Sequence, residues 1–442
     1  MSFKFPARPE LYSLEKHASR PAPRTDSRLL VCYQTLVLSI ALAVIYSNLP
    51  IYGYVLYPGL LPKFSFFCLF FLMAPLAIIK FRSWRAYLGS PFVIWAAFFF
   101  VLNLLHLTGF SQDIDIGGLH VMDSEIEARR SLIMTRAQYI LFSIFLGFIV
   151  YTSTNKVYLY AMVCLMTLLP CAVIFDFAHP GVLYPNETSG AVLGRAAAMF
   201  INPTMAGEAI LLVFLLGCAV TKAKYRVPLF LLSGAAILAT FSRSSIMAWV
   251  LILGILIVKK TLPRSAILAT VLVLAISLAF VGSFENYLHS RHELDGASSN
   301  IMSRLDFFSS FTFNDDSSEE RAEVIRAGLQ LFLQNPVFGG GAGATEFWSH
   351  RASTHNQFLL LAAEYGIFGI GLWAALLVVL VKGQFFEDKG LQFAVAFLFV
   401  FMSMFTHQML DSGFYWSATF ALISVRWNRV GIVRSEKMSK CN

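Results

Sequence analysis

The chain has 442 residues, of which 57% are hydrophobic and 14% are charged, and its formal net charge is +8. Its mean hydropathy of +0.66 lies outside the range of soluble globular proteins. Apolar runs long enough to cross about 30 Å of hydrocarbon recur along almost the whole length. These properties exclude a soluble domain with a single anchor and predict an all-α polytopic membrane protein.

The apolar runs predict about twelve transmembrane helices. Their centres lie near residues 38, 72, 99, 141, 166, 212, 234, 251, 274, 368, 399 and 418. Basic residues cluster in alternate short connections, for example at Lys80, Arg82 and Arg85 after the second run. By the positive-inside rule these connections and both tails are cytoplasmic. Nine helices then deliver a long polar segment, residues 284–354, to the opposite, extracytoplasmic face.

This topology divides the chain into five parts. They are a basic cytoplasmic tail (1–28), helices one to nine (29–283), an extracytoplasmic loop or lid (284–354), helices ten to twelve (355–426) and a second cytoplasmic tail (427–442). No small-residue cleavage site follows the first apolar run, so we expect the first tail to be retained and not to be part of a signal peptide.

The predicted outer side is rich in arginine. It holds a single lysine, Lys63, and ten arginines: Arg129, Arg130, Arg136, Arg195, Arg243, Arg291, Arg304, Arg321, Arg326 and Arg351. The planar guanidinium group binds phosphate through two parallel hydrogen bonds and stays charged when dehydrated. We interpret the set as an oxyanion site, although any one arginine could simply pair with an outer carboxylate.

The long loop contains a predicted amphipathic helix. Ser317 and Glu320 form a capping-box pattern, and the apolar periodicity continues to Leu333. The helix should rest on the membrane or pack over the spans. Its apolar face is predicted to comprise Val324, Ile325, Leu329, Phe332 and Leu333.

Arg321 lies in the first turn of this helix, where a cation opposes the helix dipole. An accompanying anion would remove the conflict. That anion is either a substrate phosphate or the neighbouring carboxylates of Glu319 and Glu320.

His355 is the candidate general base. Ser353 or Thr354 is predicted to cap the next helix, which would place His355 in its first turn. A helix N-terminus and nearby guanidinium groups would keep the imidazole neutral and able to accept a proton from a hydroxyl. The alternative is an interfacial histidine with a packing role.

Further polar residues lie at membrane depth. Arg243 is predicted between two spans with almost no loop, which implies a partner. Glu208 and Glu364 are the candidate partners, or they line a polar cavity. His407 and Asp411 form either a second polar pair or an ordinary structural contact.

Two other patterns receive no catalytic interpretation. The glycine-rich run 339–343 lacks the Lys-Ser/Thr of a phosphate-binding loop and is predicted to be a close-packed turn. The six cysteines fall in apolar runs or the C-terminal tail, and no set of residues has the spacing of metal ligands. We expect no metal, no cofactor and no nucleic-acid partner.

Several motifs follow one another in a specific order. They are Gly194-Arg195 with Asn202-Pro203, Ser242-Arg243, Arg321 leading through Pro336 to Gly343, and His355-Asn356 before a span with Gly366 and Gly369. In order and topology, residues 190–375 resemble the O-antigen ligase and O-antigen polymerase superfamily of bacterial inner-membrane glycosyltransferases. Thr204 stands where many members have a second asparagine, which puts only that position in doubt.

The resemblance implies a donor glycan linked through diphosphate to a polyprenol, and a reaction without metal. Arg195, Arg243 and Arg321 would hold the diphosphate, with Arg304 as a helper. His355 would activate the acceptor hydroxyl, and direct attack would invert the anomeric centre. Supporting contacts to substrate would come from Asn202, Asn356 and Glu364.

Three functions remain open. A ligase transfers the finished glycan to lipid A–core, and we lean towards this reaction. A polymerase for O-antigen or exopolysaccharide joins repeat units and is nearly as well supported. A transporter or flippase is the third reading, but it would place charges near the bilayer midplane, often in paired repeats, and the sequence shows no convincing repeat.

Overall fold

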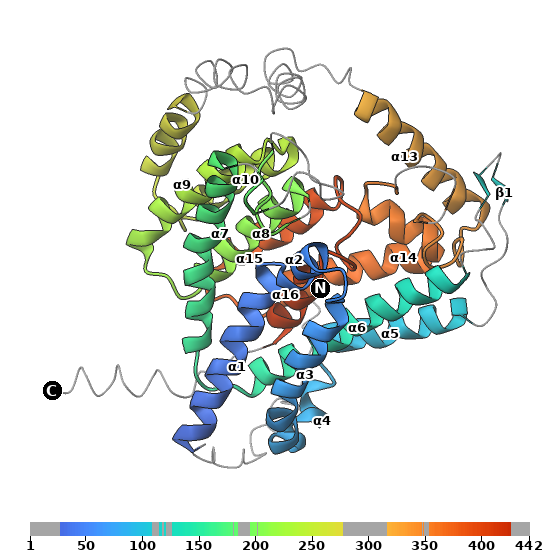
Figure 1. Cartoon of the computed structure of the whole chain (residues 1–442), viewed down its shortest axis with the longest axis horizontal. Helices are drawn as coiled ribbons and strands as arrows, with labels where there is room; N and C mark the ends of the chain where they lie inside the picture. Colours follow the sequence, from blue (N-terminus) through green and yellow to red (C-terminus); the bar gives the residue numbers. More distant parts are fainter. Residues whose placement is uncertain are drawn as a thin grey trace, which may run out of the picture.

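The computed structural model of the chain describes residues 27–107, 115–116, 119–120, 126–179, 181–183, 195–200, 202–276, 316–346, 348 and 353–425 (Figure 1). The described part is built from helices, apart from one antiparallel pair of two-residue strands, β1 (Asp115–Ile116) and β2 (Leu119–His120). The predicted tails and most of the long loop lie outside the described residues.

The first half of the structure contains seven α-helices. They are α1 (Arg28–Tyr46), α2 (Leu49–Leu56), α3 (Pro62–Ile79), α4 (Trp84–Tyr87), α5 (Pro91–Leu105), α6 (Ile126–Thr152) and α7 (Tyr160–Ala178). The second half contains α8 (Pro203–Gly217), α9 (Ala223–Ala239), α10 (Arg243–Val258), an unlabelled helix Ser265–Ile276, α13 (Asp316–Gln334), α14 (Gln357–Lys382), α15 (Lys389–Met402) and α16 (Tyr415–Ser424).

Each of the twelve predicted helix centres lies inside one of these helices, so the predicted helix positions are confirmed. The number of spans stays a prediction. Five helices are long and apolar enough to cross a membrane, and a sixth span results if Phe81–Tyr87 and Pro91–Leu105, bent by 81°, act together. Helices α8, α10 and α15 and the helix Ser265–Ile276 are apolar but shorter, because 15 residues of helix reach only about 22 Å.

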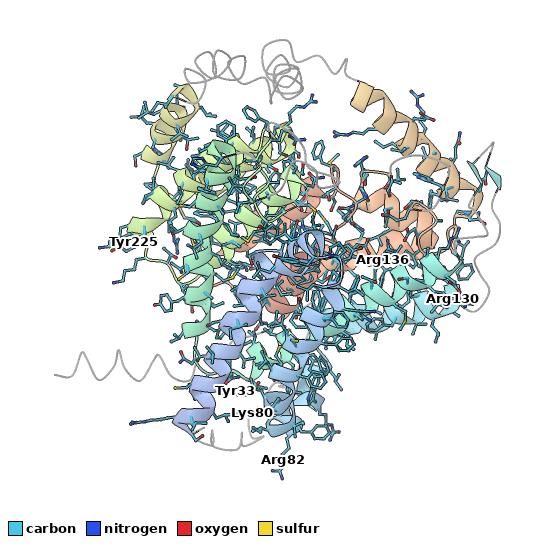
Figure 2. The ribbon with its side chains drawn as sticks, in the orientation of Figure 1. Tyr33, Lys80, Arg82, Arg130, Arg136 and Tyr225 are labelled. Atoms are coloured by element: carbon cyan, nitrogen blue, oxygen red, sulfur yellow. The ribbon has the colours of Figure 1, made fainter. Side chains whose placement is uncertain are left out.

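The burial pattern is that of a multi-pass membrane protein. Helix α8 is enclosed by its neighbours, and all of its residues except Thr204 are buried. The outer helices instead expose large apolar side chains, such as Phe67, Phe71 and Ile78 on α3. A continuous apolar surface of this kind is stable against hydrocarbon but not against water. Figure 2 shows Lys80 and Arg82 at the lower end of the helices, whereas Arg136 lies among them.

Helix α14 is broken at Gly366, which has a φ of +63°. Backbone groups on both sides of the break form hydrogen bonds with the segment that contains the glycine-rich turn. The amide of Ile367 donates to Pro336 O (2.8 Å), while Gly340 N donates to Ala363 O (2.8 Å) and Gly341 N to Glu364 O (3.0 Å). The turn therefore satisfies the backbone groups that the break would leave unpaired. The predicted close-packed turn is confirmed, and it fixes the segment that carries Glu364.

The predicted loop helix is α13, and it packs over α14. Val324, Ala327 and Leu331 form a small buried cluster with residues of the turn and of α14, and Gly328 lies against Thr354 and Leu359. Figure 1 shows α13 at the end of the assembly away from α4.

The predicted apolar face of α13 packs only partly against the rest of the protein. Of its five members, Val324 is buried and Phe332 is half-buried, whereas Ile325, Leu329 and Leu333 are exposed. Small residues, Ala327 and Gly328, make the docking face because they allow α13 to approach the Thr354 segment closely. The exposed residues form a second stripe, with a spacing of four, on another face of the helix.

Candidate functional site

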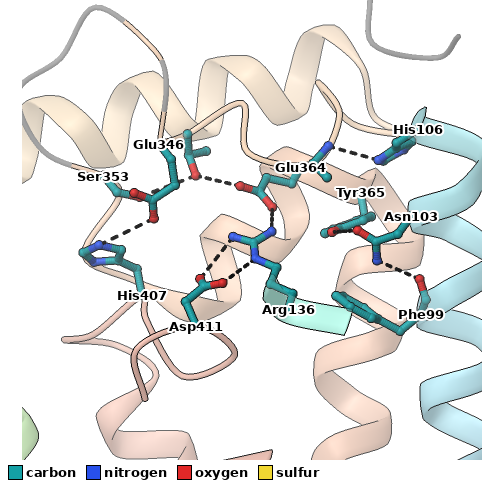
Figure 3. A network of polar contacts seen from close by, with 12 residues as sticks. Phe99, Asn103, His106, Arg136, Glu346, Ser353, Glu364, Tyr365, His407 and Asp411 are labelled. Atoms are coloured by element: carbon teal, nitrogen blue, oxygen red, sulfur yellow. Dashed lines mark hydrogen bonds and ion pairs between the residues drawn. The ribbon is translucent and has the colours of Figure 1, made fainter. Parts of the chain in front are cut away.

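A buried ion-pair network occupies the centre of the site (Figure 3). The side chain of Arg136, from the middle of α6, is 1% exposed. Its Nη1 donates to Glu364 Oε2 (2.6 Å), while its Nε and Nη2 donate to the two carboxylate oxygens of Asp411 (2.7 and 3.2 Å). One guanidinium group therefore joins α6, the broken α14 and the 403–414 segment between α15 and α16. The two-point contact with Asp411 has the geometry of a strong arginine–carboxylate pair.

The second oxygen of Glu364 extends the network towards the loop. Thr345 Oγ1 donates to Glu364 Oε1 (3.2 Å), and Ser353 Oγ donates to Thr345 Oγ1 (3.4 Å). Thr345 follows the glycine-rich turn directly, so the turn that repairs the break in α14 also supplies this hydroxyl group. All three residues are buried.

A neutral branch lies on the other side of Glu364. Tyr365 donates to Asn103 Oδ1 (2.8 Å), and the His106 ring stacks on Tyr365 with 5.0 Å between centroids. Ala342 N donates to His106 Nδ1 (3.1 Å), so this nitrogen carries no proton. Burial lowers the pKa of His106 to about 4, which keeps the ring neutral at physiological pH. This histidine is a structural brace for the glycine-rich turn.

His355 and His407 lie together at the outer edge of the network. Their rings meet edge to face, with 5.0 Å between centroids. His407 Nε2 lies 3.8 Å from Glu346 Oε1, a separation longer than a hydrogen bond. Burial, reinforced by the neighbouring His355 and Arg136 side chains, lowers the pKa of His407 to about 3. Burial, reinforced by the Asp411 carboxylate, raises the pKa of Glu346 to about 7.

The predicted local geometry of His355 was wrong. The helix begins at Gln357, and its N-cap is Asn356, whose Oδ1 accepts from Leu359 N (2.9 Å). His355 precedes the cap in the left-handed region, with a φ of +48°. His355 therefore lies outside the first turn of the helix. Its ring contacts the ring of His407 and is not placed within the first turn, where the helix dipole was expected to act on it. Asparagine takes the cap because Thr354 Oγ1 is used in a hydrogen bond to Asn356 O (3.0 Å).

A second polar cluster joins the ends of α8, α9 and α10. Arg195 Nε donates to Thr240 O (3.2 Å). Thr240 lies at the α9–α10 junction, three residues before Arg243, so this bond brings Arg195 to the junction. Thr204 Oγ1 and Ser242 Oγ lie 3.0 Å apart, and Asn202 Oδ1 accepts from Thr204 N (2.8 Å) to cap α8. The motifs around Arg195, Asn202 and Arg243 thus meet in space, although up to 48 residues separate them in the sequence.

The segment between α15 and α16 connects the two clusters. Asp411 belongs to the buried network, and Ser412 Oγ lies 4.0 Å from Met205 Sδ in the first turn of α8. At its other end, His407 contacts His355. The 403–414 segment therefore touches both the α8 cluster and the histidine pair.

The predicted partners of Arg243 were wrong. Glu364 pairs with Arg136, and Glu208 Oε2 accepts from Tyr415 Oη (3.1 Å) and Trp416 Nε1 (2.9 Å). These partners come from helices distant in the sequence, so spacing alone did not reveal them. The suggested pairing of His407 with Asp411 is also wrong.

Arg321 is exposed near the start of α13. It lies seven residues before Gly328, on the same face of the helix and about 10 Å along the axis. That face is directed towards Thr354, next to His355. Arg304 lies outside the described residues, as do Gly194 and the side chains of Ser317, Glu319 and Glu320.

Sequence reasoning missed Arg136 and Glu346 as parts of the site. Arg136 was counted among the outer arginines, yet it is the only charged residue between positions 131 and 152. A lone cation in an apolar run is a signal for a buried partner. Glu346 carried no such signal, because it stands in a polar loop. Among the described residues, no group of three or more His, Cys, Asp or Glu side chains has a metal-binding arrangement.

The comparison with known families covers part of each polar cluster. Residues 228–374 match the family model of the O-antigen ligase domain. The match runs from α9 to α14 and includes Arg243, Arg321, His355 and Glu364. No curated protein matches the chain. The members of this family are glycosyltransferase-type enzymes, ligases and polymerases. The resemblance drawn from the motifs is confirmed for this part of the chain: residues 228–374 form an O-antigen ligase domain of the ligase and polymerase superfamily.

Proposed function

We propose that the protein is a metal-independent inverting glycosyltransferase of surface-polysaccharide assembly in the bacterial inner membrane. Its donor is a glycan carried on polyprenyl diphosphate, its acceptor is a hydroxyl group, and its site faces the periplasm. The observation that carries the proposal is the order of Arg243, Arg321 and His355 within a matched O-antigen ligase domain. We lean towards a ligase with lipid A–core as acceptor, and polymerisation of repeat units is the alternative.

The donor diphosphate is assigned to the arginines of the α8–α10 cluster and α13. Arg195 and Arg243 are half-buried at neighbouring helix ends, and Arg321 is exposed on the face of α13 directed towards Thr354. Guanidinium groups at these positions offset the negative charge that develops on the leaving diphosphate. Arg304 stays a proposed helper. The apolar spans hold the prenyl chain.

The transfer step needs only one proton movement. The acceptor oxygen attacks the anomeric carbon while His355 removes the hydroxyl proton. A glycosidic bond forms, the bond from the anomeric carbon to the phosphate oxygen breaks, and polyprenyl diphosphate leaves with the electron pair. Attack from the face opposite the leaving group inverts the anomeric configuration.

The remaining predicted site residues act as positioning residues in this scheme. Asn356 caps α14 directly after His355, and Asn202 caps α8 within the Arg195–Arg243 cluster. Glu364 is fully buried, and through Arg136 it fixes α14 against α6. Rigid placement of the base and the cations favours catalysis because the geometry is set before the substrate arrives.

An in vitro transfer assay with a defined polyprenyl-diphosphate glycan and purified acceptors tests the proposal. The His355→Ala protein should lose at least 100-fold in transfer rate while inserting normally. The matched control is His179→Ala, which removes an exposed histidine at the end of α7 and should leave the rate unchanged. Full activity of His355→Ala would exclude the general-base role.

A deletion strain separates the ligase from the polymerase. Loss of a ligase leaves polymerised glycan on the carrier lipid, whereas loss of a polymerase leaves single repeats. The transport alternative would be favoured if the purified protein moved a lipid-linked glycan without forming a glycosidic bond.

A further inference from the structure

Glu346 and His407 have the geometry of a proton path that leads away from His355. The three side chains form a row, with the His355 and His407 rings 5.0 Å apart and His407 Nε2 3.8 Å from Glu346 Oε1. Side-chain exposure rises from 11% at His407 to 26% at Glu346, and His355 is half-buried. The row therefore starts at the proposed base and ends at water.

The two ring nitrogens of His407 differ in their surroundings, because Nε2 lies 3.8 Å from Glu346 Oε1. Among the described residues, its Nδ1 is buried without a hydrogen-bond partner. A buried nitrogen with no acceptor nearby is better left as a lone pair, which places the ring proton on Nε2, the atom facing Glu346. The ring can then take a proton at Nδ1 while releasing the proton on Nε2.

The surroundings of Glu346 suit a group that both takes up and releases a proton near neutral pH. Three carboxylates, Glu346, Glu364 and Asp411, lie around a single buried cation, Arg136, which is already paired with the other two. Burial and the Asp411 charge hold the pKa of Glu346 near 7, whereas the pKa of His407 is near 3. Both groups are thus neutral at mildly acidic pH.

We propose that His407 and Glu346 relay the acceptor's proton from His355 to the periplasm. When the acceptor oxygen bonds to the anomeric carbon, its proton passes to His355 and from there to Nδ1 of His407. The proton on Nε2 of His407 moves to the Glu346 carboxylate, which releases it to water. Each imidazole returns to its neutral form, and no oxidant or further reactant is needed. The contacts must shorten or recruit one water in the loaded enzyme. This inference rests on the proposed function.

The Glu346→Gln variant tests the relay, because an amide keeps the shape of the side chain but cannot accept the proton. The transfer rate kcat should fall about 10- to 100-fold with little change in the KM for the donor. The rate should recover partly in concentrated imidazole buffer, because the end of the row is open to solvent, and Glu346→Asp should retain most activity. The wild-type fall in rate on the acidic side of pH 7 should disappear. The control is Glu323→Gln, an exposed glutamate on α13.

The outcomes separate the relay from the function itself. A normal rate in Glu346→Gln, or a reduced rate with an unchanged pH profile and no buffer rescue, overturns the relay while His355→Ala stays inactive. If the wild-type protein forms no glycosidic bond, the proposed function fails. If Glu346→Gln does not fold, the same comparison of pH profile and buffer rescue is made on Glu346→Ala, which also lacks a proton acceptor, and an unchanged pH profile without buffer rescue there overturns the relay.

Discussion

The two polar clusters of this protein differ in the burial of their arginine side chains and in the groups that surround them. In the Arg136 cluster the guanidinium group is fully buried and meets two carboxylates of the same chain. In the α8–α10 cluster Arg195 and Arg243 are half-buried, and the groups described around them are hydroxyls and a backbone carbonyl, such as Ser242 and Thr240 O.

This difference assigns different tasks to the two regions. A buried cation neutralised by its own protein holds helices together, because removal of one partner leaves an uncompensated charge. A half-buried arginine at a helix end can be reached by an anionic ligand and can bind it through two hydrogen bonds. In the function proposed above, the substrate diphosphate binds at the second cluster, and the first cluster holds the helices that carry His355.

The largest effect is expected from Arg136→Met. It leaves Glu364 and Asp411 buried without their cation, and the free energy of unfolding should fall by about 3–5 kcal/mol. Thermal unfolding of the protein purified in detergent measures this loss, and the expression level reports it in cells. Adding Glu364→Gln and Asp411→Asn to the same protein should restore most of the stability. If Arg136→Met alone is as stable as wild type but inactive, then Arg136 binds substrate and the division between the clusters is wrong.

Gly366→Ala should be the next most damaging change. A Cβ there would meet the backbone of Val337, and the φ of +63° is unfavourable for alanine, so we expect a loss of more than about 2 kcal/mol. The control lies in the same helix: Gly371 has no atom within 4 Å of a built Cβ, and Gly371→Ala should stabilise α14 by up to about 1 kcal/mol. Equal melting temperatures for the two variants would contradict the role given to the break.

Arg243→Lys tests the role of the α8–α10 cluster in donor binding. The charge is kept but the two-pronged donor geometry is lost, so donor use, measured as kcat/KM, should fall about 10-fold or more without loss of stability. Arg130→Lys, an exposed arginine on α6, is the matched control. A melting temperature lowered as far as in Arg136→Met would instead make Arg243 a structural cation.

The smallest effect is the pH dependence of stability. The pKa of Glu346 is raised from 4.5 to about 7, so the unfolded chain loses this proton first and stability falls as pH rises through that interval. The pKa of His407 is lowered from 6.5 to about 3, so stability falls as pH drops from 6.5 towards 3. The two effects oppose each other between about pH 4.5 and 6.5.

Single variants should separate these contributions. Glu346→Gln should gain stability above pH 7 relative to wild type and become more sensitive to acid, whereas His407→Gln should show the reverse. Melting temperatures measured across pH 4–8 report both. Parallel curves for wild type and variants would show that neither group titrates in a buried setting.

Much of this architecture follows from local sequence. The twelve helix positions, the close-packed turn at 339–343 and the presence of α13 were predicted, because hydrophobic periodicity, glycine and capping residues act over a few positions. The contact face of α13 did not follow from the sequence. The large apolar residues Ile325 and Leu333 are exposed, whereas the small residues Ala327 and Gly328 lie at the contact with the rest of the protein. Close approach of two segments selects small residues, and no local pattern reports it.

The sequence by itself determined that this chain is a helical multi-pass membrane protein with an O-antigen ligase domain, because composition and motif order carry that information. Only the tertiary structure decided which charges are neighbours. It paired Arg136 with Glu364 and Asp411, over 228 and 275 positions of sequence, and placed His407 beside His355. A buried charge is stable only beside its partner, and the fold alone determines which distant residue that partner is.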